Sequence, residues 1–159
     1  MTFLIREYDS HRDANGLRQC IVELQEFERR LEPSLPDGEA MADRALAFLL
    51  EGCARFVGKI LVTEEDGALV GFVAVMTRVS PEDPHESPDE YAYISDLVVV
   101  ERCRGRGLGR ILLEHAEAIA RESGARRLRV GVLADNRVAR QLYEQVGFND
   151  FQVEMMKWL

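Results

Sequence analysis

The residues best suited to chemistry form a basic, glycine-rich turn at residues 104–110, where Gly105, Gly107 and Gly109 alternate with longer side chains. An apolar, β-branched run enters this turn, and the amphipathic pattern of a helix leaves it. Because glycine has no Cβ, the backbone N–H groups can approach a ligand closely there. The helix adds its unpaired N–H groups and the positive end of its dipole. The turn is therefore predicted to bind an anion, with phosphate as the favoured one.

Two common phosphate-binding loops fit this spacing poorly. A dinucleotide-binding fingerprint requires G-x-G-x-x-G, and Arg110 occupies the place of its last glycine. A nucleotide-triphosphate loop requires a lysine after the glycines, and none follows here. Both are weak interpretations of the turn, and a third kind of phosphate site has to be considered.

Strand and helix patterns alternate on both sides of the turn. Strands are predicted over residues 3–5, 56–63, 69–77, 91–100, 128–132 and 151–159, and helices over residues 10–31, 39–51, 108–123 and 136–146. Asp66-Gly67, between two apolar runs, is typical of a tight hairpin turn. Since the sequence contains no linker, repeat or low-complexity segment, residues 1–159 are predicted to form a single α/β domain with a mixed, twisted sheet.

The turn, the order of the elements and two residues downstream together resemble the GNAT superfamily of N-acetyltransferases. The pattern Arg104-x-x-Gly107-x-Gly109, entered by residues 97–99, is similar to the acyl-CoA pyrophosphate loop of that superfamily. Asn136 and the run Tyr143-Glu144-Gln145-Val146-Gly147-Phe148 also fall where its members have them. The resemblance covers essentially the full length, and it implies a partly splayed sheet flanked by helices, acetyl-CoA as cosubstrate and no metal.

The resemblance also implies where the cofactor lies. Backbone N–H groups of the turn would bind the pyrophosphate, and the arginines there would add positive charge. The amides of the pantetheine arm would add to the open edge of the preceding strand, as in β-strand addition. The cofactor-binding residues predicted in this way are Leu97, Val98, Val99, Arg104, Gly105, Arg106, Gly107, Leu108, Gly109, Arg110, Asn136 and Tyr143.

Asn136 and Tyr143 are predicted to point toward one place. They lie seven positions apart, which returns to within roughly 20° of the same helix face. By resemblance, Asn136 contacts the cofactor arm, and the Tyr143 hydroxyl lies near the thioester sulfur, where it would act as general acid. The alternatives are a helix cap for Asn136 and a core-edge aromatic for Tyr143.

The general base of such a reaction is left open by the sequence. Related diamine acetyltransferases carry a glutamate at the position matching Ser95, so polyamine specificity is in doubt here. Asp96 is the nearest carboxylate and is predicted to be the catalytic base. Strand alternation points its side chain to the opposite face unless a bulge changes that direction. Glu90, Tyr91 and Tyr93 at the start of the same strand are other candidates.

Composition limits the partners and the location. The formal net charge of -8 argues against nucleic-acid binding and suits a cationic ligand. Cys20, Cys53 and Cys103 form no CxxC pair, so reduced thiols and no metal site are expected. Since no apolar run approaches the roughly 20 residues of a membrane helix, and no signal peptide is recognisable, we expect a cytoplasmic protein without a membrane partner.

The sequence supports two functions. The first is an N-acetyltransferase that moves an acetyl group from acetyl-CoA to a primary amine of a small cationic molecule or a peptide, by direct attack. The second is a non-catalytic, acyl-CoA-binding regulatory module of the same fold. A homodimer is expected from the resemblance alone. These motifs do not identify the amine, the base or the acyl group.

Overall fold

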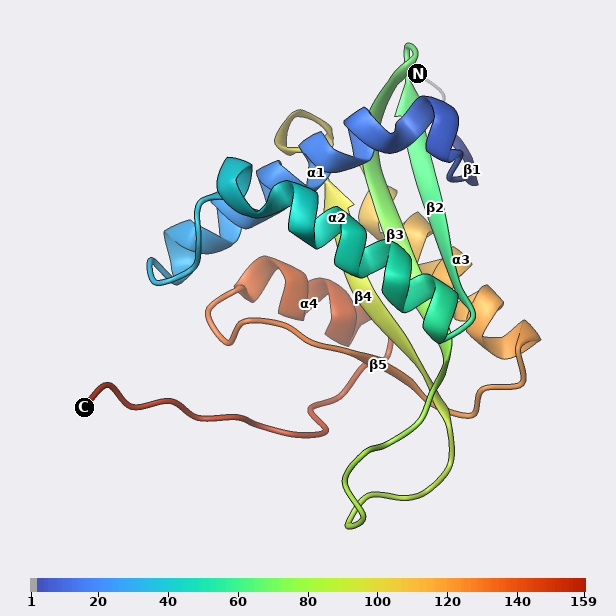
Figure 1. Ribbon diagram of the computed structural model, residues 1–159, viewed down its shortest axis with the longest axis vertical. Coiled ribbons are helices and arrows are strands. Elements are labelled where there is room, and N and C mark those ends of the chain that lie inside the picture. Colours follow the sequence, from blue (N-terminus) through green and yellow to red (C-terminus); the bar gives the residue numbers. More distant parts are fainter. Residues whose placement is uncertain (1–2) are drawn as a thin grey trace.

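The computed structural model describes residues 3–159, with a five-stranded sheet between layers of helices (Figure 1). Met1 and Thr2, which belong to the predicted domain, lie outside the described residues. The elements are β1 (Leu4–Glu7), α1 (Ser10–Leu31), α2 (Gly38–Arg55), β2 (Gly58–Glu65), β3 (Ala68–Val79), β4 (Tyr91–Val99), a 3₁₀ turn (Glu101–Cys103), α3 (Leu108–Glu122), β5 (Leu128–Val130) and α4 (Arg137–Gln145).

The sheet is mixed, as predicted. Its strands follow the order β1-β2-β3-β4-β5, the first four pairing antiparallel and β5 pairing parallel to β4. Helices α1 and α2 cover one face and α3 covers the other (Figure 1). Helix α4 packs against the start of α3. The contact is close, because Leu142 Cδ2 of α4 lies 3.1 Å from the position that a Cβ on Gly109 would occupy.

Local sequence signals explain most element boundaries. Asp66 and Gly67 turn the β2–β3 hairpin with φ of 51° and 78°, which is the left-handed backbone that a two-residue hairpin turn requires. Asp9 caps α1 by accepting the His11 N–H, and Asn136 caps α4 by accepting the Ala139 N–H. These caps and the hairpin confirm the boundaries predicted at those positions.

Strand β3 lies at the centre of the core. Its residues from Val70 to Met76 are all buried, because helices cover both faces of the sheet at this strand. Leu17, Cys20 and Ile21 of α1 bury their side chains in the same core as Leu112 and Ala116 of α3. Cys20 is therefore a core residue, and Cys53 is only partly buried.

The predicted last strand, residues 151–159, is wrong. Residues 148–159 have no regular secondary structure, and the segment runs away from the sheet toward the C-terminus (Figure 1). An alternating apolar pattern makes a strand only where a neighbouring strand edge accepts its hydrogen bonds. Within residues 3–159, no strand pairs with these last residues.

Candidate active site

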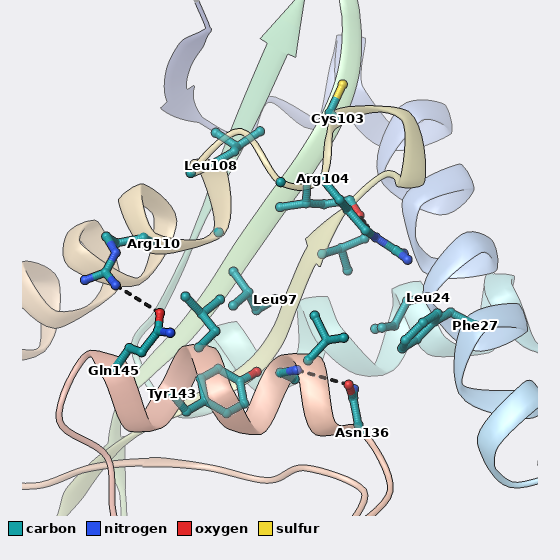
Figure 2. A pocket seen from close by; sticks show the side chains of 18 residues that line it. Leu24, Phe27, Leu97, Cys103, Arg104, Leu108, Arg110, Asn136, Tyr143 and Gln145 are labelled. Atoms are coloured by element: carbon teal, nitrogen blue, oxygen red, sulfur yellow. Dashed lines mark hydrogen bonds between the residues drawn. The ribbon is translucent and has the colours of Figure 1, made fainter.

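A cavity of about 430 Å³ opens beside β4, between α1, the glycine turn and α4 (Figure 2). It is lined by Leu24, Phe27, Leu97, Val98, Val99, Cys103, Arg104, Gly105, Gly107, Leu108, Gly109, Arg110, Asn136, Val138, Ala139, Leu142, Tyr143 and Gln145. The structure therefore brings together every predicted cofactor-binding residue except Arg106. Asp96 precedes Leu97 in β4 but is not part of the lining.

The cavity lies where β4 and β5 part. Strand β5 pairs with β4 only at Ala92, Tyr93 and Ile94. From Ser95 to Val99, the edge of β4 turned away from β3 has no strand partner among residues 3–159. An unpaired strand edge presents backbone N–H and C=O groups in a row, so it can bind a peptide-like group.

The glycines of the turn have two different physical roles. Gly105 and Gly107 have φ of 73° and 81°, and a Cβ on either would meet no atom within 4 Å. They are needed for the left-handed backbone and not for space. The first hydrogen bond of α3 runs from Ile111 N–H to the Gly107 carbonyl. The N–H groups of residues 108–110 therefore have no partner inside the helix, and these residues face the cavity.

The four arginines in the glycine turn and just before it divide into two pairs. Arg104 donates from Nε to the Val99 carbonyl at 2.9 Å, and its guanidinium lies 4.7 Å from the Phe27 ring centroid. Arg110 donates to Gln145 Oε1 at 3.2 Å (Figure 2). Both line the cavity, and they bring positive charge to the place where the unpaired N–H groups converge.

Arg102 and Arg106 form the other pair, which turns toward the β2–β3 hairpin. Glu65 accepts from Arg106 at 2.8 Å and lies 3.5 Å from Arg102. The guanidinium of Arg106 also lies 4.4 Å from the Phe3 ring centroid. The Arg106 side chain is therefore directed toward the hairpin, and its predicted contact with the cofactor stays a prediction.

Cys103 lines the cavity wall as a buried, hydrogen-bonded thiol. It is 1% exposed, and its Sγ lies 3.5 Å from Glu65 Oε2. Burial, followed by the hydrogen bond to Glu65, raises the pKa of this thiol. A thiol held protonated is a poor nucleophile.

Tyr143 and Asn136 share the cavity face of α4, as their spacing predicts (Figure 2). Asn136 also caps the helix, its Oδ1 accepting the Ala139 N–H at 3.1 Å. The Tyr143 ring packs edge-on against Phe148 with 5.7 Å between centroids. Its hydroxyl has no hydrogen bond among the described residues, so it is available to a ligand.

Burial raises the pKa of Tyr143 to about 12, and the nearby carboxyl of Glu28 adds to the effect. The phenol is therefore protonated across the neutral range, and it can donate a proton at a neutral pH but cannot accept one.

A β-bulge at Ser95 decides where Asp96 points. Ala74 pairs with Asp96, and the next residue of β3, Val75, pairs with Ile94, so Ser95 is the extra residue. Paired residues share a face of the sheet, so Asp96 lies on the opposite face from Ile94. It shares its face with Tyr93, which pairs with Met76. Simple alternation would place Asp96 with Ile94.

The bulge turns Asp96 toward α1 and α2. Met76 lies on the same face, and its side chain packs against Gly52 of α2 so closely that a Cβ there would contact it. Burial raises the pKa of Asp96 above its ordinary value. The Asp96 charge also contributes to the raised pKa of Tyr93 and Glu28. Asp96 therefore belongs to a group of partly buried acids and phenols beside the cavity.

Glu28 of α1 is the member of this group that the sequence reasoning missed. It follows Leu24, a cavity-lining residue, by one helical turn. Its carboxylate has no hydrogen bond or ion pair within residues 3–159. Burial, and then the charge of Asp96, raises its pKa. The available signal was its place on the apolar stripe of α1, where a carboxylate is costly unless it has a role.

Among the described residues, no group of three or more His, Cys, Asp or Glu side chains is placed to hold a metal ion. No helix of residues 3–159 has the length and apolar character needed to cross a membrane.

The sequence is similar to that of known acetyltransferases. A profile of the acetyltransferase (GNAT) family matches residues 21–148. The uncharacterized N-acetyltransferase YhfO of Bacillus subtilis is 35% identical over 106 residues, which cover 67% of this chain and 68% of YhfO. The uncharacterized N-acetyltransferase YycN of the same organism is 40% identical over 74 residues, 46% of this chain. That alignment spans 47% of the length of YycN, about half of it.

Solved structures share the fold. The tetramutant of the BH1408 protein from Bacillus halodurans superposes with a TM-score of 0.83 at 21% identity, covering 98% of this chain and 99% of that one. AAC(6')-Iy, in complex with the bisubstrate analogue CoA-S-monomethyl-acetylneamine, gives a TM-score of 0.69 at 17% identity, covering 100% of this chain and 99% of that one. At these identities the likeness concerns the fold alone.

Proposed function

The chain belongs to the acetyltransferase (GNAT) family, and on that premise we propose that it transfers an acetyl group from acetyl-CoA to a primary amine of a small cationic molecule or a peptide. One observation carries the proposal. The cavity beside β4 gathers the glycine turn, an unpaired strand edge and the protonated Tyr143 phenol. Each of these groups has a separate task in such a transfer.

The residues of the cavity fit acetyl-CoA. The N–H groups of residues 108–110, with Arg104 and Arg110, suit a pyrophosphate. The unpaired edge of β4 from Ser95 to Val99 suits the amides of a pantetheine arm. When bound, acetyl-CoA supplies a thioester, which is an activated form of the acetyl group. AAC(6')-Iy, with its CoA-containing analogue, has the same fold.

Tyr143 is the proposed general acid. Its hydroxyl has no partner in the described chain, and its pKa of about 12 keeps it protonated. In this role it holds a proton at the phenol oxygen for the thiolate that leaves. The buried Cys103, with its raised pKa, offers no covalent route, so the amine takes the acetyl group directly.

Asp96 and Glu28 are the proposed proton acceptors. An alkyl ammonium, whose pKa is about 10.4, must lose a proton before it can attack. Carboxyls whose pKa values are raised toward neutrality accept protons better than ordinary ones. Burial raises the pKa values of Asp96 and Glu28, and their negative charge also attracts a cationic amine. This pair supports a cationic acceptor.

Thiol release from acetyl-CoA tests the proposal. The purified chain is incubated with polyamines, aminoglycosides, amino acids and peptides with free N-termini, and free thiol is measured with a chromogenic disulfide. We expect one class of amine to accelerate release. Calorimetric binding of CoA is measured in parallel. Tight CoA binding without acceleration by any amine would favour the regulatory module, and absence of CoA binding would refute both functions.

A further inference from the structure

Helix α1 touches the chain around the glycine turn at two places, one helical turn apart. The guanidinium of Arg104 lies over the Phe27 ring, 4.7 Å from its centroid, and the exposed Arg30 lies over the same ring at 5.4 Å. Four residues before Phe27, the Glu23 carboxylate accepts the N–H of Glu101, in the 3₁₀ turn that leads to Arg104. The helix is thus anchored to this part of the chain by Glu23, and it contacts Arg104 through the Phe27 ring.

Two contacts from different directions hold the Arg104 guanidinium. Its Nε donates to the Val99 carbonyl at 2.9 Å. The Val98 carbonyl points toward Gly71 of β3, so by strand alternation the Val99 carbonyl belongs to the unpaired edge of β4. The second contact is the Phe27 ring, toward which the Arg104 side chain is directed (Figure 2). A rotation of this side chain would break one contact or the other, so the two together fix its direction.

Neither contact uses the two terminal nitrogens of Arg104. These nitrogens carry the other N–H donors of the guanidinium, and within residues 3–159 they donate to no group. They belong to a side chain that lines the cavity, as do residues 108–110 with their unpaired N–H groups. A fork of N–H donors matches two oxygens of a phosphate. Because the arginine is fixed before a ligand arrives, binding has little of this long side chain left to order.

We propose that Phe27 is a positioning residue for cofactor binding, which acts by holding the Arg104 guanidinium toward the pyrophosphate of CoA. The proposal rests on the proposed function, because it concerns the same cavity. A cation over an aromatic face is attracted by the electrons of the ring, and an aliphatic side chain offers no such attraction. The next residue of α1 is Glu28, so one helix serves both the phosphate-binding end of the cavity and its acidic group.

Phe27→Leu removes the aromatic face and keeps an apolar side chain at a partly buried position, so the variant should remain folded. We expect the dissociation constant of CoA, measured by calorimetry, to rise about fivefold, or about 1 kcal/mol. Phe27→Tyr keeps the aromatic face and should stay within about twofold of the wild-type value. Phe56→Leu is the matched control: Phe56 lies 4.8 Å from the guanidinium of Arg55, outside the cavity lining, and its replacement should leave the affinity unchanged.

A double-mutant cycle with Arg104→Ala separates positioning from direct contact with the cofactor. Arg104→Ala alone should raise the dissociation constant of CoA about tenfold. If Phe27 acts through Arg104, the double variant should also show about tenfold, whereas independent effects would multiply to about fiftyfold. A second readout needs no ligand. The Nε–H signal of Arg104 in ¹⁵N NMR spectra, assigned by its loss in Arg104→Ala, should be sharp in the wild-type chain and in Phe27→Tyr and broadened in Phe27→Leu.

Three results would overturn the proposal and leave the proposed function standing. One is an unchanged affinity for CoA in Phe27→Leu. Another is a cycle in which the two effects multiply, because Phe27 would then act without Arg104. The third is an equal loss in Phe27→Tyr, because the aromatic face would then be irrelevant. A wild-type chain that does not bind CoA would instead refute the proposed function, and this proposal with it.

Discussion

Replacement of Tyr143 by phenylalanine removes a single oxygen from the cavity wall. The Tyr143 hydroxyl has no hydrogen bond in the described chain, so its loss leaves no buried partner unsatisfied, and the ring can keep its contact with Phe148. The fold and the affinity for acetyl-CoA should therefore change little. The proton supplied to the leaving thiolate is lost, and general acid catalysis typically contributes at least about 100-fold.

The raised pKa of Tyr143 also makes a prediction about pH. With a pKa of about 12, roughly one molecule in 10,000 carries the ionised phenol at pH 8. The kcat of the wild-type protein should therefore not fall through ionisation of Tyr143 at any pH below about 10. Any alkaline limb nearer neutrality must belong to another group, and it should persist in Tyr143→Phe.

Steady-state thiol release at saturating amine measures both quantities. We expect Tyr143→Phe to lower kcat about 100-fold, equal to about 2.7 kcal/mol in activation free energy, with the KM for acetyl-CoA within about twofold of the wild-type value. Tyr8→Phe, the same chemical change at a residue outside the cavity lining, should retain the wild-type kcat. An unchanged kcat in Tyr143→Phe would refute the general-acid role.

Three further variants test other parts of the structure. Glu28→Gln should lower kcat on the order of 100-fold and remove the acidic limb of the kcat profile, because a carboxyl with a raised pKa loses its function as a base when pH falls through that pKa. A retained limb would assign the base to another group. Arg104→Ala should raise the dissociation constant of CoA about tenfold, or about 1.4 kcal/mol, and change that of S-acetylpantetheine, which has no pyrophosphate, much less. Equal losses in the two calorimetric titrations would contradict that assignment. Arg6→Met should destabilise the fold by about 3 kcal/mol at pH 7 in urea unfolding, because the buried Asp13 carboxylate loses the guanidinium that lies 2.6 Å away and keeps the more distant Arg12, at 3.5 Å, and the Asp9 N–H. Arg6 holds the pKa of Asp13 below its ordinary value, so the pair stabilises the protein above about pH 4 and the difference between the proteins should shrink as acid protonates Asp13.

The features that sequence reasoning predicted are those set by a few neighbouring residues. The Asp66-Gly67 hairpin, the glycine turn and the shared face of Asn136 and Tyr143 each depend on short-range backbone rules. Their positions in the fold followed from the order of the elements. For that reason most of the cavity lining could be predicted before the structure was known.

The features that were missed depend on contacts between distant parts of the chain. Arg106 is held by Glu65, 41 positions away, so its basic character alone did not show where its side chain lies. Glu28 reaches the site only because α1 packs across β4. Residues 151–159 have a strand pattern, but a strand also needs a neighbouring edge, which the pattern cannot provide.

The bulge at Ser95 makes the length of β4 as important as its composition. Because side chains alternate with a period of two, removal of Ser95 would exchange the faces of all residues before it in the strand. Either Asp96 would turn toward α3, or Ile94 would leave the core in which it is 1% exposed. A substitution at Ser95 keeps the number of residues in β4, so the other side chains keep their faces. A single-residue deletion instead moves either Asp96 away from the site or Ile94 out of the core. We expect Ser95 to tolerate exchange for other small residues far better than loss.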